Sequence, residues 1–313
     1  MIRNNPLSLS NSGRLHKKKG YLYIHYHDSD AIKLIMAFNA RRFARNKRPY
    51  PVLVESERER KALERIKTRV ILGKEMRSKR KMVDAREVTE QEPVFYYYLY
   101  HQGEAYHSMT EKDRLDLLNT PEYANIIKLD SLYQDMNLYK AFEQTEIIAG
   151  KLSTLGANDK LYILGHGRAG MPIVTSELDD ANLIPTRELV LRLKDAGLSK
   201  AILDIRLDTC ESADPVSLVS FSDLTSPLHN LKKFFSGKTS AAQTLSEALT
   251  YAGYPNVTVT GYHGSGLVLY RVGHEPHRET AVRSCDNLQR LRVETAKRAS
   301  TLRQTFRGGQ KLL

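Results

Sequence analysis

Disulfide-forming residues and long apolar segments are both scarce in this chain. Two cysteines in 313 residues cannot form a disulfide framework, so we expect a reducing compartment in which both thiols stay available for chemistry. No window approaches the roughly 20 apolar residues of a membrane-spanning helix, and the N-terminus lacks the apolar core of a secretory signal peptide. These absences argue against a membrane-spanning protein and against export by the general secretory route.

Acidic residues are also in short supply. The chain has 36 Asp and Glu against 48 Lys and Arg, a formal net charge of +12. This surplus favours a polyanionic partner such as nucleic acid, an anionic membrane face or a phosphorylated small molecule, although a solvated basic surface gives the same balance. With 41% hydrophobic residues, the chain can build a core for one large domain with insertions or for two small ones.

The distribution of polar and apolar residues divides the chain into three parts. Residues 1–20 are rich in Ser, Asn and Lys and are expected to be disordered. A start of this kind also resembles the non-cleaved export signals of bacterial type III effectors. Residues 21–275 form the predicted domain, with a basic helical insertion at about 57–90. Residues 276–313 are expected to form a basic helical tail.

Strand and helix patterns alternate within the predicted domain. A strand at 21–27, a helix after it and a strand at 51–56 make one βαβ unit, which implies a parallel sheet. A further strand is expected at 93–101, followed by helical pieces at 110–155. Later in the chain, strands are predicted at 160–166, 200–210 and 256–262, with helices at 186–197 and 240–253. The predicted fold class is α/β.

Two of these predicted strands end in residues that carry chemistry. Gly165-His166-Gly167 ends one strand, and Cys210 ends the next. Carboxyl ends of neighbouring parallel strands meet at one edge of a sheet, where ligands bind, so we expect His166 and Cys210 to lie together. An imidazole can accept the proton of a thiol and later protonate a leaving amine. Without a side chain, Gly167 can bring its N–H to the substrate and, with the N–H of Cys210, stabilise an oxyanion.

Each of these residues also has a simpler interpretation. A lone histidine at a strand end is more often structural than catalytic, and a lone cysteine is usually a small core residue; it is the joint pattern that favours catalysis. A rival base is His263, which would give the Cys-then-His order of papain-like enzymes. We expect His263 on the far side of Cys210, in a loop suited to holding substrate. Cys285 has no strand around it, and we treat it as incidental.

The order of apolar strand, His-Gly, helix, apolar strand and Cys resembles that of caspase-like cysteine proteases. The sequence GHGR at 165–168 is similar in particular to the autoprocessing protease domains of RTX toxins and large clostridial toxins. Three other stretches fit these domains in order: YIHY at 23–26, FARNKRPY at 43–50 and FYYY at 95–98. The resemblance covers about residues 20–275, and its specific motifs are the His-Gly and the Cys.

This resemblance implies a caspase-like fold, with a mostly parallel central sheet flanked by helices and a β-flap. It also implies an endopeptidase that uses His166 and Cys210, needs no metal and is activated by inositol hexakisphosphate. Because that activator occurs in eukaryotic cells, the resemblance suggests a toxin or effector that a specialised bacterial secretion system delivers into the host cytoplasm.

The resemblance also assigns residues to two binding sites. The substrate pocket would be lined by the loop Tyr262, His263, Gly264, Ser265 and Gly266. This loop holds no arginine, so it does not favour the acidic preference of caspases. The activator site is expected away from the catalytic cleft, between the end of the first helix and the flap. Its residues would be Arg41, Arg42, Arg45, Lys47, Arg48, Arg271 and Arg278.

The chain departs from the toxin pattern around the cysteine. Those domains usually have small apolar residues before it, whereas this chain has Asp208 and Thr209. Asp204, Arg206 and Asp208 would share one face of their strand, although a covered parallel strand should be apolar on both faces. Either this face is poorly covered or its charges pair. Some of the toxin domains also orient the histidine with an acidic residue, for which Asp28 and Asp30 are candidates.

Two other functions are compatible with the same residues. A thiol acyltransferase would share the acyl-enzyme on Cys210 and pass the acyl group to an amine. A binding protein for nucleic acid or an acidic membrane would instead use the basic residues near Arg45 and the run at 57–81. The aromatic residues are not interleaved with those charges as stacking platforms would be, which argues against nucleic acid.

Overall fold

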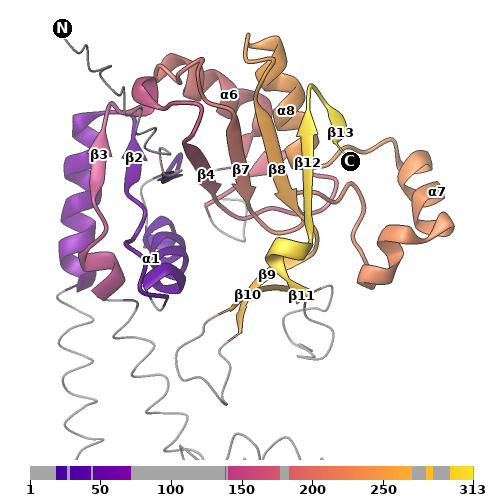
Figure 1. The fold of residues 1–313 in the computed structure, drawn as a ribbon, viewed down its shortest axis with the longest axis horizontal. Helices are drawn as coiled ribbons and strands as arrows, with labels where there is room; N and C mark the ends of the chain where they lie inside the picture. Colours follow the sequence, from indigo (N-terminus) through magenta and orange to yellow (C-terminus); the bar gives the residue numbers. More distant parts are fainter. Residues whose placement is uncertain are drawn as a thin grey trace, which may run out of the picture.

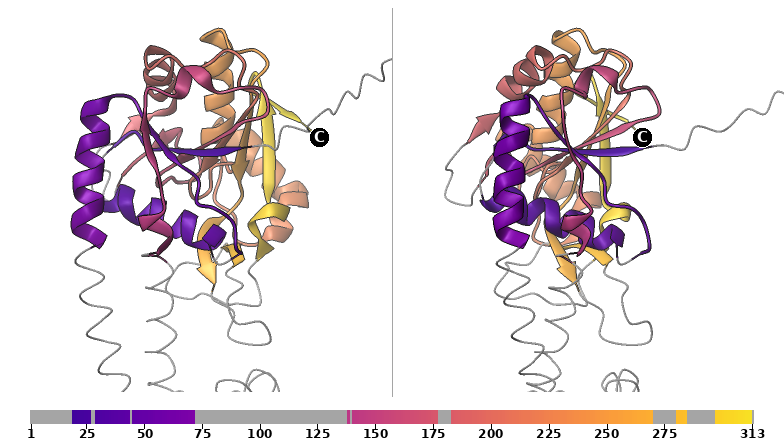
Figure 2. Two further views of the ribbon diagram at one scale, coloured as in Figure 1. Left: turned by 60° about the vertical axis from the view of Figure 1, so that its left-hand side comes forward. Right: turned by 90° about the vertical axis from the view of Figure 1, so that its left-hand side faces the viewer.

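A computed structural model describes residues 19–26, 29–43, 45–71, 138, 140–176, 183–269, 280–284 and 297–312. The fold is α/β, with a mostly parallel central sheet that carries helices on both faces (Figures 1 and 2). The sheet has eight strands in the order β13-β12-β8-β7-β4-β1-β2-β3. Strands β3, β2, β1, β4, β7 and β8 run parallel to one another. β12 is antiparallel to β8, and β13 is antiparallel to β12.

The strands of the main sheet are β1 (Gly20–Tyr23), β2 (Val52–Val54), β3 (Ile147–Ala149), β4 (Lys160–Leu164), β7 (Asp204–Asp208), β8 (Thr258–Tyr262), β12 (Arg303–Arg307) and β13 (Gln310–Leu312). Two small sheets are formed by β5 (Ile173–Val174) with β6 (Ile184–Pro185), and by β9 (Ser265–Leu269), β10 (Thr280–Ser284) and β11 (Lys297–Arg298). The helices are α1 (Ser29–Phe43), α6 (Thr186–Asp195), α7 (Pro227–Ser236), α8 (Ala241–Tyr251), the 3-10 turns η1 (Leu152–Thr154), η2 (Phe221–Thr225) and η5 (Ala299–Thr301), and residues 57–71.

Alternating side chains build one core on each face of the sheet. On β1, Tyr21 and Tyr23 join the cluster that contains α6 and α8, whereas Leu22, and Ile24 just after the strand, join the cluster that contains α1 and the helix 57–71. Successive residues of a strand point to opposite faces, so a strand covered on both sides must be apolar throughout. This is why these β1 residues are all buried.

Most of the predicted elements are confirmed. The strands expected at 21–27, 51–56, 160–166, 200–210 and 256–262 are β1, β2, β4, β7 and β8, and the helices expected at 186–197 and 240–253 are α6 and α8. Of the helical pieces predicted within 110–155, residues 140–143 and η1 are helical, whereas 147–149 form β3, because a three-residue strand is too short to show a period. The strand predicted at 93–101 lies outside the described residues.

The predicted division of the chain needs one correction. A basic helical tail after residue 275 is wrong in the described part, because β12 joins the main sheet beside β8, with Phe306 opposite Val259. Phe306 is 4% exposed, and the basic residues at both ends of this strand are exposed. A single inward aromatic among charged residues gives a weak strand signal, so composition suggested a solvated helix.

The other predicted parts are described only partly. Residues 1–18 lie outside the described residues, and of the predicted insertion at 57–90 the structure describes a helix at 57–71. Among the described helices, none combines the length and the apolar character that crossing a membrane requires.

Candidate active site

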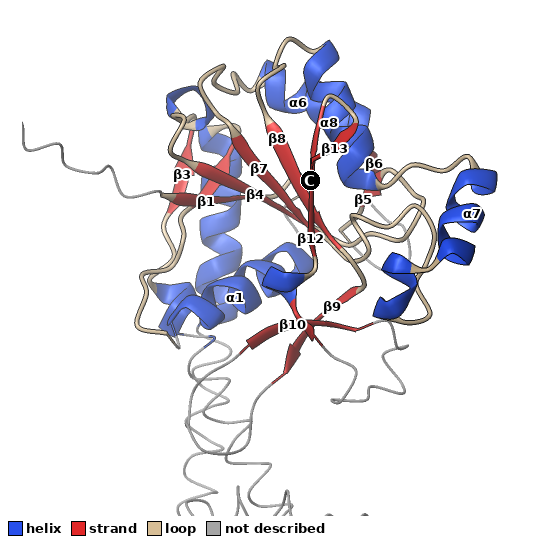
Figure 3. Cartoon of the chain, turned by 45° about the vertical axis from the view of Figure 1, so that its right-hand side comes forward, coloured by secondary structure: helices blue, strands red, loops and turns tan. Residues whose placement is uncertain are grey.

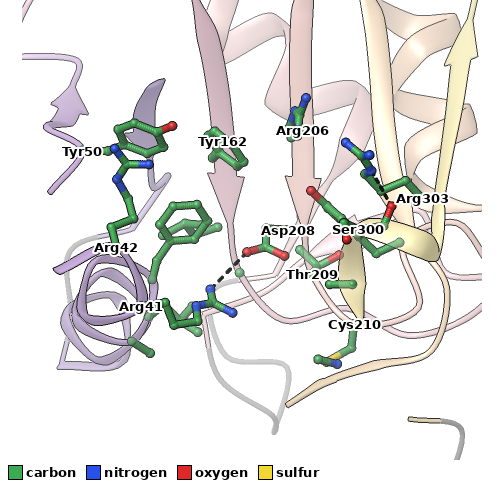
Figure 4. Close-up of a pocket in the computed structure, with 18 of the residues that line it drawn as sticks. Arg41, Arg42, Tyr50, Tyr162, Arg206, Asp208, Thr209, Cys210, Ser300 and Arg303 are labelled. Carbon is green, nitrogen blue, oxygen red and sulfur yellow. Dashed lines mark hydrogen bonds and ion pairs between the residues drawn. The ribbon is translucent and has the colours of Figure 1, made fainter. Parts of the chain in front are cut away.

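The two predicted catalytic segments leave the sheet side by side. Strands β4 and β7 are parallel neighbours, with Leu164 opposite Asp208. His166 and Cys210 each follow two residues later, and both line one cavity of about 380 Å³. Figure 4 shows Cys210 below the ends of these strands, at one end of that cavity. The expectation that the two residues lie at the same edge of the sheet agrees with this placement.

The glycines around His166 allow close packing of the backbone. A Cβ atom on Gly167 would lie 2.8 Å from Thr209 Oγ1 and 3.0 Å from the carbonyl oxygen of Cys210, and one on Gly165 would collide with the side chain of Val174. His166 itself exchanges two backbone hydrogen bonds with Thr175, of 2.9 and 3.2 Å. The histidine segment is therefore held against the cysteine segment on one side and against Thr175 on the other.

Replacing Gly167 by alanine is expected to disturb this contact. The new methyl group has no room against Thr209 and Cys210, so the free energy of unfolding should fall by about 1–3 kcal/mol. Urea unfolding measures the loss. Gly156→Ala is the matched control, because its Cβ atom would make an ordinary contact of 3.7 Å with Asp159. An equally stable Gly167→Ala variant would contradict the tight packing.

Cys210 lies in a loop that is tied to the following strands. Its Sγ accepts a hydrogen bond from the N–H of Gly266 at 3.4 Å, and the N–H of Glu211 donates to the carbonyl of Gly264 at 2.9 Å. The Glu211 carboxylate accepts from the N–H of Ala169 at 3.3 Å, which links this loop to the histidine segment. The loop, the turn before β9 and the segment after His166 thus form one hydrogen-bonded unit.

A buried acidic residue holds this unit in place through hydrogen bonds. Asp214 is 1% exposed, and its carboxylate accepts from the N–H of Gly264 at 2.8 Å and pairs with Nδ1 of His263 at 2.6 Å. His263 is not among the residues that line the cavity with Cys210. This geometry gives His263 a role in holding the loop. Of the other predicted pocket residues, Tyr262 and Gly266 line the cavity, whereas Gly264 and Ser265 do not.

Removal of the Asp214 carboxylate should destabilise the protein. Asp214→Ala leaves His263 and the buried N–H of Gly264 without their partner, and we expect the free energy of unfolding to fall by about 3 kcal/mol. Thermal melting measures the loss. Asp195→Ala, at an exposed carboxylate on α6, should melt like the unmodified protein. Unchanged melting of Asp214→Ala would show that the pair contributes no stability.

The wall of the cavity carries a strong excess of positive charge. Six basic side chains line it, from the end of α1 and the loop after it, from β7 and from β12, and Asp208 is the one carboxylate among the lining residues. They are Arg41, Arg42, Arg45, Lys47, Arg206 and Arg303. Convergence of cations from three segments that are far apart in the sequence is the arrangement that binds a compact polyanion.

Ion pairs explain the polar face of β7. Arg206 makes two hydrogen bonds of 3.1 Å to Asp204, Lys160 lies 3.7 Å from the same carboxylate, and Arg41 lies 3.7 Å from Asp208. Burial is the largest single influence and acts to lower the pKa of Arg206, but the hydrogen bonds to Asp204 and the interactions with Tyr162, Asp204 and Tyr262 together outweigh it, so the pKa is raised. Of the two sequence-based explanations for this face, pairing of the charges is therefore the one that the structure supports.

Aromatic rings lie among these cations. The guanidinium carbon of Arg42 is 3.2 Å from the centroid of the Tyr50 ring, Tyr50 is stacked on Tyr162 at 5.6 Å, and Phe38 meets Tyr162 edge-on at 4.9 Å. Burial lowers the pKa of Arg42, and it raises the pKa of Tyr162. Aromatic and basic residues that are not interleaved in the sequence thus lie next to one another in space. The ring of Tyr50, however, already contacts the guanidinium of Arg42 and the ring of Tyr162.

The prediction that these basic residues form a site away from the catalytic cleft is wrong, because Arg41, Arg42, Arg45 and Lys47 line the same cavity as His166 and Cys210. Only part of the basic wall was predicted from the sequence. Arg48 does not line the cavity, and its carbonyl oxygen accepts from Nε of Arg42 at 3.0 Å. Arg206 and Arg303 line the cavity but were not predicted to do so. The position of Arg206 on the same face of its strand as Asp208 was the sequence signal for it, and Arg303 was assigned to a helical tail. Arg271, Arg278, Cys285, Asp28 and the side chain of Asp30 lie outside the described residues.

Comparisons with known protein families, with curated proteins and with solved structures find no match for this chain. Within the described residues, no group of three or more His, Cys, Asp or Glu side chains is placed to hold a metal ion. The function must be argued from the side chains that meet at the carboxyl edge of the sheet.

Proposed function

We propose that this protein is a cysteine endopeptidase with a caspase-like arrangement, in which Cys210 is the nucleophile and His166 the general acid–base. The observation that carries the proposal is the placement of both residues at the ends of adjacent parallel strands, where they line one cavity. A thiol and an imidazole that follow neighbouring strands can share a proton and face the same substrate carbonyl.

The reaction follows from these positions. His166 accepts the thiol proton, and Sγ of Cys210 attacks the carbonyl carbon of the peptide bond. The negative charge on the carbonyl oxygen is stabilised by backbone N–H groups, with Gly167 and Cys210 as donors. His166 then gives its proton to the leaving amine, and the C–N bond breaks. Water, deprotonated by His166, hydrolyses the thioester and restores the thiol.

The basic cavity fits an inositol hexakisphosphate activator by its chemistry. Six cations from α1 and the loop after it, from β7 and from β12 line it, of which Arg41 and Arg206 also pair with Asp208 and Asp204, and the cavity is of the size of small-molecule sites. β12 follows the three-stranded sheet of β9, β10 and β11, which stands where the β-flap is expected. Because β9 donates the N–H of Gly266 to Cys210, a ligand that orders this region would also order the nucleophile.

In this proposal the protein acts after delivery into a host cell. An activator that occurs in eukaryotic cytoplasm would keep the protease inactive in the bacterium and switch it on after transfer by a specialised secretion system. The excess of basic residues around the cavity supports the proposal of an anionic activator, and this support does not depend on the assignment of the catalytic pair.

Incubation of the purified protein with and without inositol hexakisphosphate tests the proposal. We expect new fragments of the protein itself or of an added peptide library, only with the ligand and only with an intact Cys210. A parallel incubation with an acyl donor and an amine separates the two acyl-enzyme reactions. Transfer to the amine in place of hydrolysis would assign a thiol acyltransferase.

A further inference from the structure

Helix α7 exposes an apolar face that no described residue covers. None of its ten residues is buried, and Leu228, Leu231, Phe234 and Phe235 are 63%, 53%, 79% and 79% exposed. These residues recur every three to four positions and so share one side of the helix. In Figures 1 and 3, α7 stands apart from the sheet and from the helices that cover it.

Local signals, and not packing, specify this helix. Ser226 caps its N-terminus by accepting from the N–H of His229, Pro227 occupies the first turn, and Gly237 ends it in a left-handed conformation with φ of 61°. Isolated helices shorter than about 12–15 residues are marginal in water, and most helices are stabilised by burial of an apolar face. A helix that is so clearly delimited and yet buries nothing is expected to bury its face against a partner.

Three lysines lie on this helix or next to it, and the nearest acidic residue in the sequence is Asp223, four residues before its start. Lys232 and Lys233 lie within the helix and Lys238 follows it, all three exposed, and no acidic residue lies between 224 and 246. Exposed aromatic side chains together with lysines are the composition of helices that lie in the headgroup region of an anionic bilayer. The net charge of +12 attracts the whole protein to the same surface.

The face is large enough to act as a docking surface. Its four side chains expose on the order of 500 Å², within the range of functional patches on monomers. The helix also projects outward from the sheet (Figures 1 and 3), and none of its residues lines the cavity that contains Cys210.

We propose that α7 is a membrane-docking element, which inserts Leu228, Leu231, Phe234 and Phe235 between the headgroups of an anionic bilayer while its lysines contact the phosphates. This inference concerns a surface outside the catalytic cavity and does not depend on the proposed protease activity.

The absence of tryptophan from the chain makes a direct test possible. Phe234→Trp in the full chain carries a single reporter on this face. We expect solvent-exposed emission in buffer, a blue shift with vesicles of phosphatidylcholine and phosphatidylserine, and little shift with phosphatidylcholine alone. Tyr251→Trp, at an 84% exposed position on α8, is the matched control and should not respond. Buried emission without vesicles would mean that another part of the chain covers α7, and would overturn the proposal.

Vesicle sedimentation then separates the contributions of the phenylalanines and the lysines to membrane binding. Phe234→Ser with Phe235→Ser should weaken binding to phosphatidylserine vesicles at least about tenfold, and Lys232→Gln with Lys233→Gln should weaken it by roughly fivefold per lysine at low salt. Both variants should melt like the unmodified protein because these side chains are exposed, and the rings of Phe234 and Phe235 meet each other, with 5.5 Å between centroids, outside the core. Unchanged vesicle binding of the phenylalanine variant would overturn the proposal. The proposal would also be overturned if the unmodified protein binds no vesicles but self-associates, and the phenylalanine variant does not self-associate.

Discussion

Cys210→Ala is expected to lower the rate of peptide cleavage by roughly 10⁴-fold or more while the protein stays folded, because the variant has no nucleophile for the acyl-enzyme. Cys210 is only half-buried, and its one described side-chain contact is the N–H of Gly266. Its removal should therefore change the melting temperature little. Cleavage of a peptide library, followed with matched melting curves, measures both quantities.

Three further variants identify the partner of the thiol. His166→Ala should lose activity to a similar degree, because no other described side chain is proposed to move the proton. Cys285→Ala should keep full activity. His263→Ala should lose stability, since it breaks the pair with Asp214, but should retain cleavage at low temperature. Loss of cleavage in folded His263→Ala together with normal activity of His166→Ala would reverse the assignment and support the papain-like order.

Inositol hexakisphosphate is expected to raise the melting temperature of the inactive Cys210→Ala variant. A ligand present at 100 times its Kd stabilises the folded state by about 2.7 kcal/mol, which corresponds to a rise of roughly 5–10 °C for a domain of this size. Salt should reduce the effect because it screens the phosphates from the arginines. Differential scanning fluorimetry at two salt concentrations measures the shift.

Two neighbouring residues provide the matched variants. Arg45→Ala with Lys47→Ala removes two charge-assisted contacts and should weaken binding by roughly 100-fold, so that the shift falls to about 1 °C at the same ligand concentration. Arg48→Ala is the control, because Arg48 is adjacent in sequence but does not line the cavity. Equal shifts in all three proteins would place the ligand elsewhere.

The activator and the substrate need separate tests, because Cys210 and the arginines line the same cavity. If inositol hexakisphosphate stabilises the protein but slows cleavage, the cations bind an acidic group of the substrate. If it changes neither melting nor cleavage at low salt, the activation part of the proposal is wrong and the basic wall serves another partner.

The catalytic candidates could be predicted from the sequence because their signals are local. An apolar run that ends in Gly-His-Gly defines β4, a short stretch of alternating polar and apolar residues before a cysteine defines β7, and parallel strands joined by a helix place their ends at one edge. The same argument gave the α/β class. The capped helices α6 and α8 were predictable for the same reason, since caps and periodicity are written in neighbouring residues.

The composition of the basic wall was decided only by the tertiary structure. Arg303 reaches the cavity because β12 adds to the sheet beside β8, a pairing of residues about 40 positions apart that no local pattern specifies. Asp208 and Arg41 likewise form an ion pair across more than 160 residues, and Asp214 holds His263 through contacts that depend on how two loops meet. The sequence by itself determined β1, β2, β4, β7 and β8 and where they end, because these strands have apolar patterns and boundaries that are visible in neighbouring residues. Which charges face one another depends on strand order and loop packing, and only the tertiary structure decided it.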